Sequence, residues 1–269
     1  MLLLRSLAYL IFLFVTVAPW GTLSCLTFPL PQPVRYKLIT YWTWIAIWGA
    51  RVICGIDYKV IGLENLPVPF KEGGMIFLCK HQSRYETLLF RGLFSPVCYV
   101  YKRELHYVPF FGWGIALCGM IAINRGKSKA ALDQVATVGN KRLHEGWNMV
   151  MFPEGTRVDP GQKRRYKVGG TYLSVATREP VVPVAHNAGD VWPRGKWTKK
   201  PGLVTVSLGP AIYPDTMTAE QQMAKVEAWI EAEMRRLFPH QYANESAAQA
   251  TVATTGQAAT QTTNQTEAG

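Results

Sequence analysis

The segment GMIFLCKHQSRYETLL, residues 74–89, holds the strand, the turn and the helix start that set the fold. Its first part, Met75–Cys79, is a short apolar run typical of a buried β-strand. Its last part begins with Ser83-x-x-Glu86, a capping-box pattern ahead of apolar residues at helical spacing, so it predicts a helix. The polar residues between these two elements then lie at the C-terminal end of a strand, where α/β sheets place active sites.

The same alternation continues through the rest of the chain. We expect five further short strands at Val97–Tyr101, Met120–Ile123, Met149–Phe152, Val181–Val184 and Leu203–Leu208. Helical patterns lie between them, with an N-cap at Ser128 and a capping box at Thr218-x-x-Gln221. Apolar strands separated by helices predict an α/β fold with a largely buried sheet. The sequence has no internal repeat, no G-x-G-x-x-G motif and no P-loop, which disfavours nucleotide binding by those routes.

The composition narrows the class of protein. Of 269 residues, 48% are hydrophobic and only 17% are charged, which excludes a wholly disordered chain. Lysine and arginine number 29 against 18 acidic residues, and the net charge of +11 attracts nucleic acid, an anionic membrane surface or a phosphorylated substrate. The five cysteines form no C-x-x-C pair, so we expect buried thiols in a reducing compartment rather than disulfides or a metal site.

Residues 1–57 differ from the rest of the chain and predict a membrane anchor of two apolar helices. No charged residue lies between Arg5 and Arg35. The first apolar run is interrupted at Pro19, so it is short for a clean span of the bilayer. The second run, residues 38–50, carries tryptophans, which prefer the membrane–water boundary. Whether these segments span the bilayer or form a hairpin in its surface stays open.

A cleaved signal peptide is the alternative interpretation of the N-terminus, but no small-x-small cleavage site follows Ala18. The other end of the chain, residues 243–269, is polar, with no aromatic residue and a single valine. Such a segment cannot bury enough apolar area to offset its ordering entropy, so it predicts a disordered tail. Residues 58–242 then form the α/β domain.

Two polar clusters interrupt apolar runs in this domain. The first runs from Lys80 to Glu86. In it, a carboxylate at Glu86 can reach the ring of His81, fix its tautomer and leave the other ring nitrogen as a base. The alternative is that Glu86 only caps the helix. The second cluster, Phe152 to Arg157, reads FPEGTR directly after an apolar strand. Its glycine would let a ligand approach the backbone closely, and its arginine is suited to binding a phosphate. The alternative is a surface turn with a solvated ion pair and no function.

Together, and in this order, the two clusters resemble the glycerolipid acyltransferases, and they are most similar to the bacterial 1-acyl-sn-glycerol-3-phosphate acyltransferases. The resemblance runs from about residue 58 to 210 and includes further blocks at Lys102–Trp113, Met120–Arg125, Tyr166–Gly170 and Val182–Ala185. Two positions depart from the family's pattern: Glu86 stands where the family has aspartate, and Lys80 stands where asparagine is common.

The resemblance implies acyl transfer from acyl-CoA or acyl carrier protein to the sn-2 hydroxyl of lysophosphatidic acid, which gives phosphatidic acid. It assigns His81 as the general base and Glu86 as the group that orients it, without a cofactor, a metal, or a serine or cysteine nucleophile. The substrate-binding residues that it implies are Lys102, Arg125, Glu154, Gly155, Thr156 and Arg157. It also implies a protein of the bacterial inner membrane, with membrane lipids as partners and the active site at the cytoplasmic face.

Other classes of protein fit the sequence less well. A non-catalytic basic membrane protein that recruits nucleic acid or an acidic partner would leave His81 and Glu86 unexplained. We expect no nucleic-acid partner, because the sequence has no dense basic run with interleaved aromatic residues. A lipid hydrolase is disfavoured because no G-x-S-x-G elbow is present. Another lyso-lipid acceptor would use the same base and a similar cradle, so the acceptor stays open, as do the acyl-chain length and the acyl donor.

Overall fold

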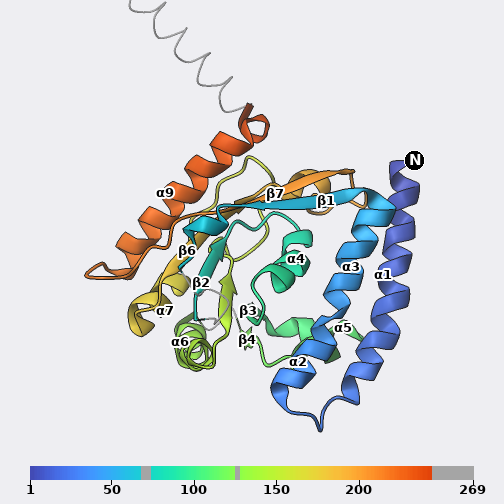
Figure 1. Ribbon diagram of the computed structural model, residues 1–269, viewed down its shortest axis with the longest axis horizontal. Helices are drawn as coiled ribbons and strands as arrows, with labels where there is room; N and C mark the ends of the chain where they lie inside the picture. Colours follow the sequence, from blue (N-terminus) through green and yellow to red (C-terminus); the bar gives the residue numbers. More distant parts are fainter. Residues whose placement is uncertain (68–73, 125–127, 244–269) are drawn as a thin grey trace, which may run out of the picture.

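The computed structural model describes residues 1–67, 74–124 and 128–243, and within them the core is one mixed sheet (Figure 1). Its strands are β1 (Ile56–Ile61), β2 (Ile76–Cys79), β3 (Val97–Lys102), β4 (Ile121–Ile123), β5 (Asn148–Met151), β6 (Val181–His186) and β7 (Gly202–Leu208). They lie in the order β1-β7-β6-β2-β5-β3-β4. Neighbouring strands are parallel except for β6 and β7, which are antiparallel.

The six strands expected from the sequence are therefore confirmed, but β1 was not predicted. In residues 56–61, apolar side chains alternate with charged ones, as in a strand with one exposed face. β1 lies at one edge of the sheet and pairs with β7, about 146 positions further along the chain, from Ile56 opposite Gly202. The alternation is short, and the partner strand that it pairs with is too far along the chain to be recognised from the local sequence. The predicted limit between residues 57 and 58 falls within this strand.

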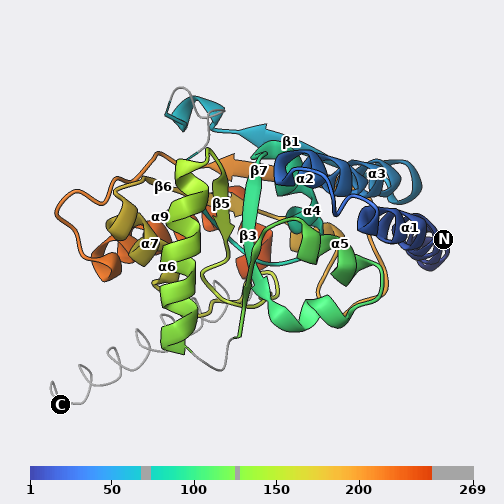
Figure 2. The same ribbon diagram turned by 90° about the horizontal axis from the view of Figure 1, so that it is seen from below.

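Helices cover both faces of the sheet (Figures 1 and 2). The helices of this part of the chain are α4 (Tyr85–Leu93), α5 (Phe111–Leu117), α6 (Ser128–His144), α7 (Gly169–Thr177), α8 (Ala188–Val191) and α9 (Ala219–Leu237), with short 3-10 helices η2 (Leu63–Asn65), η4 (Arg103–Tyr107) and η5 (Pro239–Tyr242). Alternate residues of β2 enter two separate cores: Phe77 packs with α4, and Leu78 packs with α6, α7 and α9. Every residue of β2 is buried, which confirms the largely buried sheet. The predicted capping box at Thr218 and Gln221 is also present, at the start of α9.

The N-terminal region folds as α1 (Leu2–Cys25), α2 (Gln32–Thr40), α3 (Trp42–Gly49) and a π-helical turn, η1 (Ala50–Cys54). The expectation that Pro19 interrupts the first helix was wrong, because α1 continues through it. Tertiary contacts just beyond the proline hold the continued helix against the rest of the protein. The Trp20 indole N–H donates to the Ile39 carbonyl at 3.0 Å, and Gly21 lies so close to the Phe110 backbone that a Cβ there would be 2.5 Å from its oxygen.

α1 is long and apolar enough to cross a membrane, judged by length and composition alone. One side of it packs on the protein near both ends, through buried Ser6 and Ser24. Its other side exposes large apolar residues, and α3 beside it exposes tryptophans: Leu4, Leu7, Ile11, Phe14, Trp44 and Trp48. The helices thus present an exposed apolar face, and α1 and α3 lie side by side at one end of the molecule (Figure 1). The predicted tail falls almost entirely on residues 244–269, which lie outside the described residues.

Candidate active site

Two polar loops meet at the carboxyl ends of β2 and β5. These strands are parallel neighbours, with Leu78 opposite Met151, so the residues that follow them lie side by side. Beside these loops is a cavity of about 700 Å³. His81 lines it after β2, and Phe152 to Arg157, except Glu154, line it after β5. The position matches the rule that open α/β sheets bind ligands beyond the carboxyl ends of their strands.

The expected pairing of His81 with Glu86 is present in the structure. His81 Nδ1 lies 2.9 Å from Oε1 of Glu86, which is fully buried in the first turn of α4. The same oxygen accepts the backbone N–H groups of Gln82 at 3.0 Å and Ser83 at 2.7 Å. Ser83 Oγ accepts the N–H of Tyr85 at 3.1 Å, so Ser83 serves the helix start. Glu86 therefore combines the capping role and the histidine-orienting role that the sequence left as alternatives.

The charges around Glu86 keep it ionised. Burial alone would raise the pKa of this carboxyl, but the hydrogen bond from His81, nearby His186 and the N–H of Ser83 together hold the pKa below its ordinary value. An ionised Glu86 accepts the Nδ1 proton, which leaves Nε2 of His81 as the basic nitrogen. The ring stacks on Phe152, with centroids 3.9 Å apart and planes at 17°, so its orientation is fixed from two sides.

A buried charge cluster lies behind the histidine. Lys80 is fully buried, and its Nζ is 2.8 Å from Glu231 Oε1 on α9 and 3.5 Å from Glu154 Oε1. Tyr166 donates to Glu231 at 3.1 Å. Glu154 is fully buried and accepts the His81 backbone N–H at 3.4 Å. Burial raises the pKa of Glu154 to about 7 although Lys80 opposes the shift.

This cluster changes the role expected for Glu154. Its carboxylate contacts Lys80 and the backbone of His81, and it is absent from the residues that line the cavity. The resemblance implied that Glu154 binds the substrate, but a carboxylate placed outside the cavity wall does not contact a substrate in the cavity. Lys80 and Glu231 were not predicted as parts of the site. Lys80 carried one signal, its departure from the family's asparagine, whereas nothing in the α9 sequence marked Glu231.

The cavity is cationic. Four basic residues line it, and no acidic side chain is among its described lining residues. The basic residues are Arg84, Lys102, Arg157 and Lys167. Partial burial and the guanidinium groups of Arg84 and Arg194 lower the pKa of Arg157, as expected where cations gather. Gly155 has φ of +70°, and a Cβ there would lie 3.0 Å from Lys167 Nζ, so the glycine admits that lysine.

The structure brings together Lys102, Gly155, Thr156 and Arg157 as the sequence implied, since all four line the same cavity as His81. Lys102 also pairs with Glu104 at 3.2 Å. Arg125 lies outside the described residues. Arg84 was missed as a cavity residue, although it stands inside the first polar cluster. Sequence alone did not show that it turns towards the cavity rather than to solvent.

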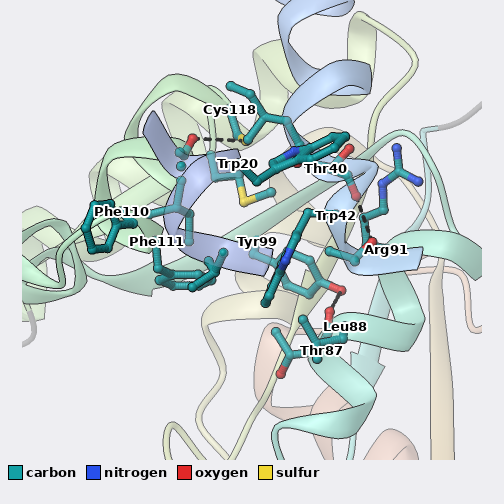
Figure 3. A pocket seen from close by; sticks show the side chains of 17 residues that line it. Trp20, Thr40, Trp42, Thr87, Leu88, Arg91, Tyr99, Phe110, Phe111 and Cys118 are labelled. Carbon is teal, nitrogen blue, oxygen red and sulfur yellow. Dashed lines mark hydrogen bonds between the residues drawn. The ribbon is translucent and has the colours of Figure 1, made fainter. Parts of the chain in front are cut away.

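The far side of the cavity is apolar and adjoins a second, smaller cavity of about 100 Å³. The smaller one lies between α1–α3 and the sheet domain, with Trp20, Phe110 and Cys118 in its wall (Figure 3). Both cavities are lined by Trp42, Thr87, Leu88, Tyr99, Phe111 and Ile115. The apolar surface beside His81 thus extends towards the N-terminal helices.

Comparison with known proteins first identifies the class of protein to which the chain belongs. Residues 57–187, which hold the histidine–carboxylate pair and most of the sheet, match the family model described as Acyltransferase. The chain is 42% identical over 243 residues to a 1-acyl-sn-glycerol-3-phosphate acyltransferase of Pseudomonas aeruginosa, which covers 88% of this chain and 93% of that protein. It is 33% identical over 138 residues to a protein of the same name from Saccharomyces cerevisiae, covering 50% of this chain and 44% of that one.

The chain therefore belongs to the 1-acyl-sn-glycerol-3-phosphate acyltransferase family, and the resemblance seen in its motifs is confirmed. The fold matches the crystal structure of the 1-acyl-sn-glycerophosphate (LPA) acyltransferase PlsC from Thermotoga maritima, with a TM-score of 0.72. That match covers 88% of this chain and 95% of the other at 24% identity, so it concerns the fold.

Proposed function

We propose that this protein transfers an acyl group from an acyl thioester to the sn-2 hydroxyl of lysophosphatidic acid and so forms phosphatidic acid. The observation that carries the proposal is a histidine base, oriented by buried Glu86, in a cavity that has cations and no described acidic side chain in its wall. Such a cavity suits an acceptor that carries both a phosphate and a hydroxyl.

In the proposed mechanism, Nε2 of His81 removes the proton from the acceptor hydroxyl as its oxygen attacks the thioester carbonyl carbon. The new C–O bond forms a tetrahedral intermediate, the C–S bond then breaks, and the imidazolium returns its proton to the leaving thiolate. Glu86 holds the ring and stabilises the imidazolium. Because the acceptor oxygen attacks directly, the reaction needs no nucleophilic side chain and no cofactor.

The phosphate of the acceptor would lie against the cationic part of the cavity. Arg157 is the main ligand in this proposal, since a guanidinium binds two phosphate oxygens at once. Gly155 and Thr156 offer backbone and hydroxyl groups beside it, and Lys102 adds charge. Arg125, which lies outside the described residues, is the further phosphate ligand that the resemblance implies. Glu154 acts indirectly, because it accepts the backbone N–H of His81 and thereby positions the base.

The acyl chains would lie along the apolar surface that joins the two cavities, towards α1–α3 (Figure 3). Since α1 packs on the protein near both ends, we infer that α1 and α3 lie in the membrane surface rather than cross it. An interfacial site spares the chains transfer into water. The proposed location is the cytoplasmic face of the bacterial inner membrane, with acyl-CoA or acyl carrier protein as donor.

The test is an assay of purified protein with an acyl thioester and a panel of lyso-acceptors, with identification of the product lipid. His81→Ala should lower kcat at least ~10²-fold with lysophosphatidic acid. His144→Ala, on α6 and away from the cavity, is the matched control and should not change kcat. Normal turnover by the His81 variant would refute the mechanism, and acylation of a different acceptor alone would refute the proposed substrate.

A further inference from the structure

An exposed tryptophan stands in a basic surface loop that the proposed mechanism does not use. The loop, residues 193–200, connects α8 to β7 and contains no acidic residue. Trp197 is 73% exposed, although it is one of the largest apolar side chains. Arg194, Lys196 and Lys200 beside it are exposed too. We call residues 193–200 the tryptophan loop.

This loop is held in place rather than loose. The backbone N–H of Lys199 donates to Ser6 Oγ on α1 at 2.7 Å. Lys199 itself is buried, with Nζ 4.8 Å from the Trp192 ring centroid and 5.6 Å from that of Tyr9. Its Nζ also donates to the Trp197 carbonyl at 3.4 Å. A buried cation thus fixes the backbone of an exposed tryptophan, so the exposure is a property of the fold.

The loop borders the exposed apolar face of α1. The bond to Ser6 places it at the N-terminal end of that helix, where Leu3, Leu4 and Leu7 are 63%, 71% and 50% exposed. That end of α1 lies beside the β1–β7 edge of the sheet (Figure 1). Tryptophan among lysines next to an exposed apolar helix face is the composition that favours the membrane–water boundary.

The loop also contacts the proposed phosphate site. Arg194 Nη1 donates to the backbone oxygen of Arg157 at 2.7 Å, and Arg157 lines the cavity with His81. The depth of the loop in a membrane surface would therefore also set the depth of Arg157.

We propose that the tryptophan loop is a membrane-binding element separate from α1–α3, which inserts Trp197 at the interface and binds anionic phospholipid headgroups through Lys196 and Lys200. The lipid contact itself does not depend on the proposed function. One consequence does rest on it: the loop holds Arg157 at the depth in the membrane where the phosphate of a lyso-acceptor lies. The positive charge and the continuity with α1 favour a lipid surface over an acidic protein.

The test measures binding of the full chain to vesicles of phosphatidylcholine alone or with about a third phosphatidylglycerol. K196Q/K200Q should bind the anionic vesicles about 25-fold more weakly, at about fivefold for each lysine, and the neutral vesicles unchanged. W197A should bind both kinds severalfold more weakly. The charge-matched control K141Q/K225Q, on α6 and α9, and the aromatic control Y213A should bind like the unchanged protein.

Activity separates this inference from the proposed function. In detergent micelles the loop variants should acylate lysophosphatidic acid normally, and on anionic vesicles they should be slower. A protein inactive in micelles would refute the proposed function alone. Loop variants that bind vesicles as the controls do would refute the lipid contact alone. If they bind vesicles normally but lose activity only with acyl carrier protein as donor, the loop binds an acidic protein and the lipid assignment is wrong.

Discussion

Replacing Lys80 by methionine tests whether the buried charge cluster supports the site. The change removes the ammonium group and keeps a long unbranched side chain. Lys80 and Glu154 are fully buried and Glu231 is 6% exposed, so the charge that remains cannot be compensated by water. Removing one partner of a buried pair costs ~3–5 kcal/mol in the free energy of unfolding.

Two features of the cluster place the cost at the lower end of that range. Glu231 keeps the hydroxyl of Tyr166 at 3.1 Å and the guanidinium of Arg235 at 3.4 Å. Glu154, with a pKa of about 7 even beside Lys80, takes up a proton rather than stay charged alone. We therefore expect K80M to lose about 3 kcal/mol, which lowers the unfolding temperature by roughly 6–12 °C in a domain of this size.

The assay is thermal unfolding of K80M, E231Q and the double variant, together with kcat for each. The double variant should be less destabilised than the sum of the two single variants, because each single change already removes the Lys80–Glu231 pair. Lys163 and Glu227, 3.0 Å apart, form an exposed pair that also ends on α9, so K163Q is the matched control and should cost at most about 1 kcal/mol. A K80M protein that unfolds within about 1 °C of the unchanged one would show that the pair stabilises nothing.

Changes at three further residues test the site. Measured at saturating acceptor, E86Q should lower kcat roughly 10²-fold, whereas E86D should keep most of the kcat of the unchanged protein. If E86Q and E86D have the same kcat, the carboxylate has no part in catalysis. R157A should chiefly raise KM for lysophosphatidic acid, and an unchanged KM would exclude the phosphate role. Glu154 has a folded-state pKa raised from 4.5 to about 7, so its stabilisation is full below about pH 4.5 and lost as pH rises through 7. E154Q should remove that dependence, a difference on the order of 3 kcal/mol in unfolding titrations, and parallel pH profiles would contradict it.

Local patterns predicted most of the sheet because five of the six strands concerned, all but β4, are mostly buried. β2 is apolar at every position and is bounded by polar residues, so periodicity and length identify it without knowledge of its partners. β1 has only one covered side, and its place depends on β7, far along the chain. Pro19 misled for a similar reason, since the contacts that keep α1 continuous come from Ile39 and Phe110.

The site shows the same division between local and distant information. His81 and Glu86 are five residues apart, so their contact follows from a strand end and a helix start. The Lys80–Glu231 bond joins residues 151 positions apart, and it depends on how α9 packs across the sheet. The burial of Glu154 has the same origin: its motif identified a conspicuous carboxylate, but only the packing showed that it turns away from the cavity.

Glu86 explains why capping and catalysis need not compete for one side chain. A single oxygen, Oε1, accepts two backbone N–H groups at the start of α4 and also the Nδ1 proton of His81. The backbone bonds fix the carboxylate, and the fixed carboxylate then orients the ring, so the capping contacts support the contact for which we propose a catalytic role. The extra methylene of glutamate, relative to the family's aspartate, is therefore taken up by reaching back from within the helix. E86D keeps the charge but should lengthen these three hydrogen bonds together. Its loss of kcat, much smaller than that of E86Q, should therefore come with a loss of stability in the same variant, and a loss of one without the other would separate the two roles.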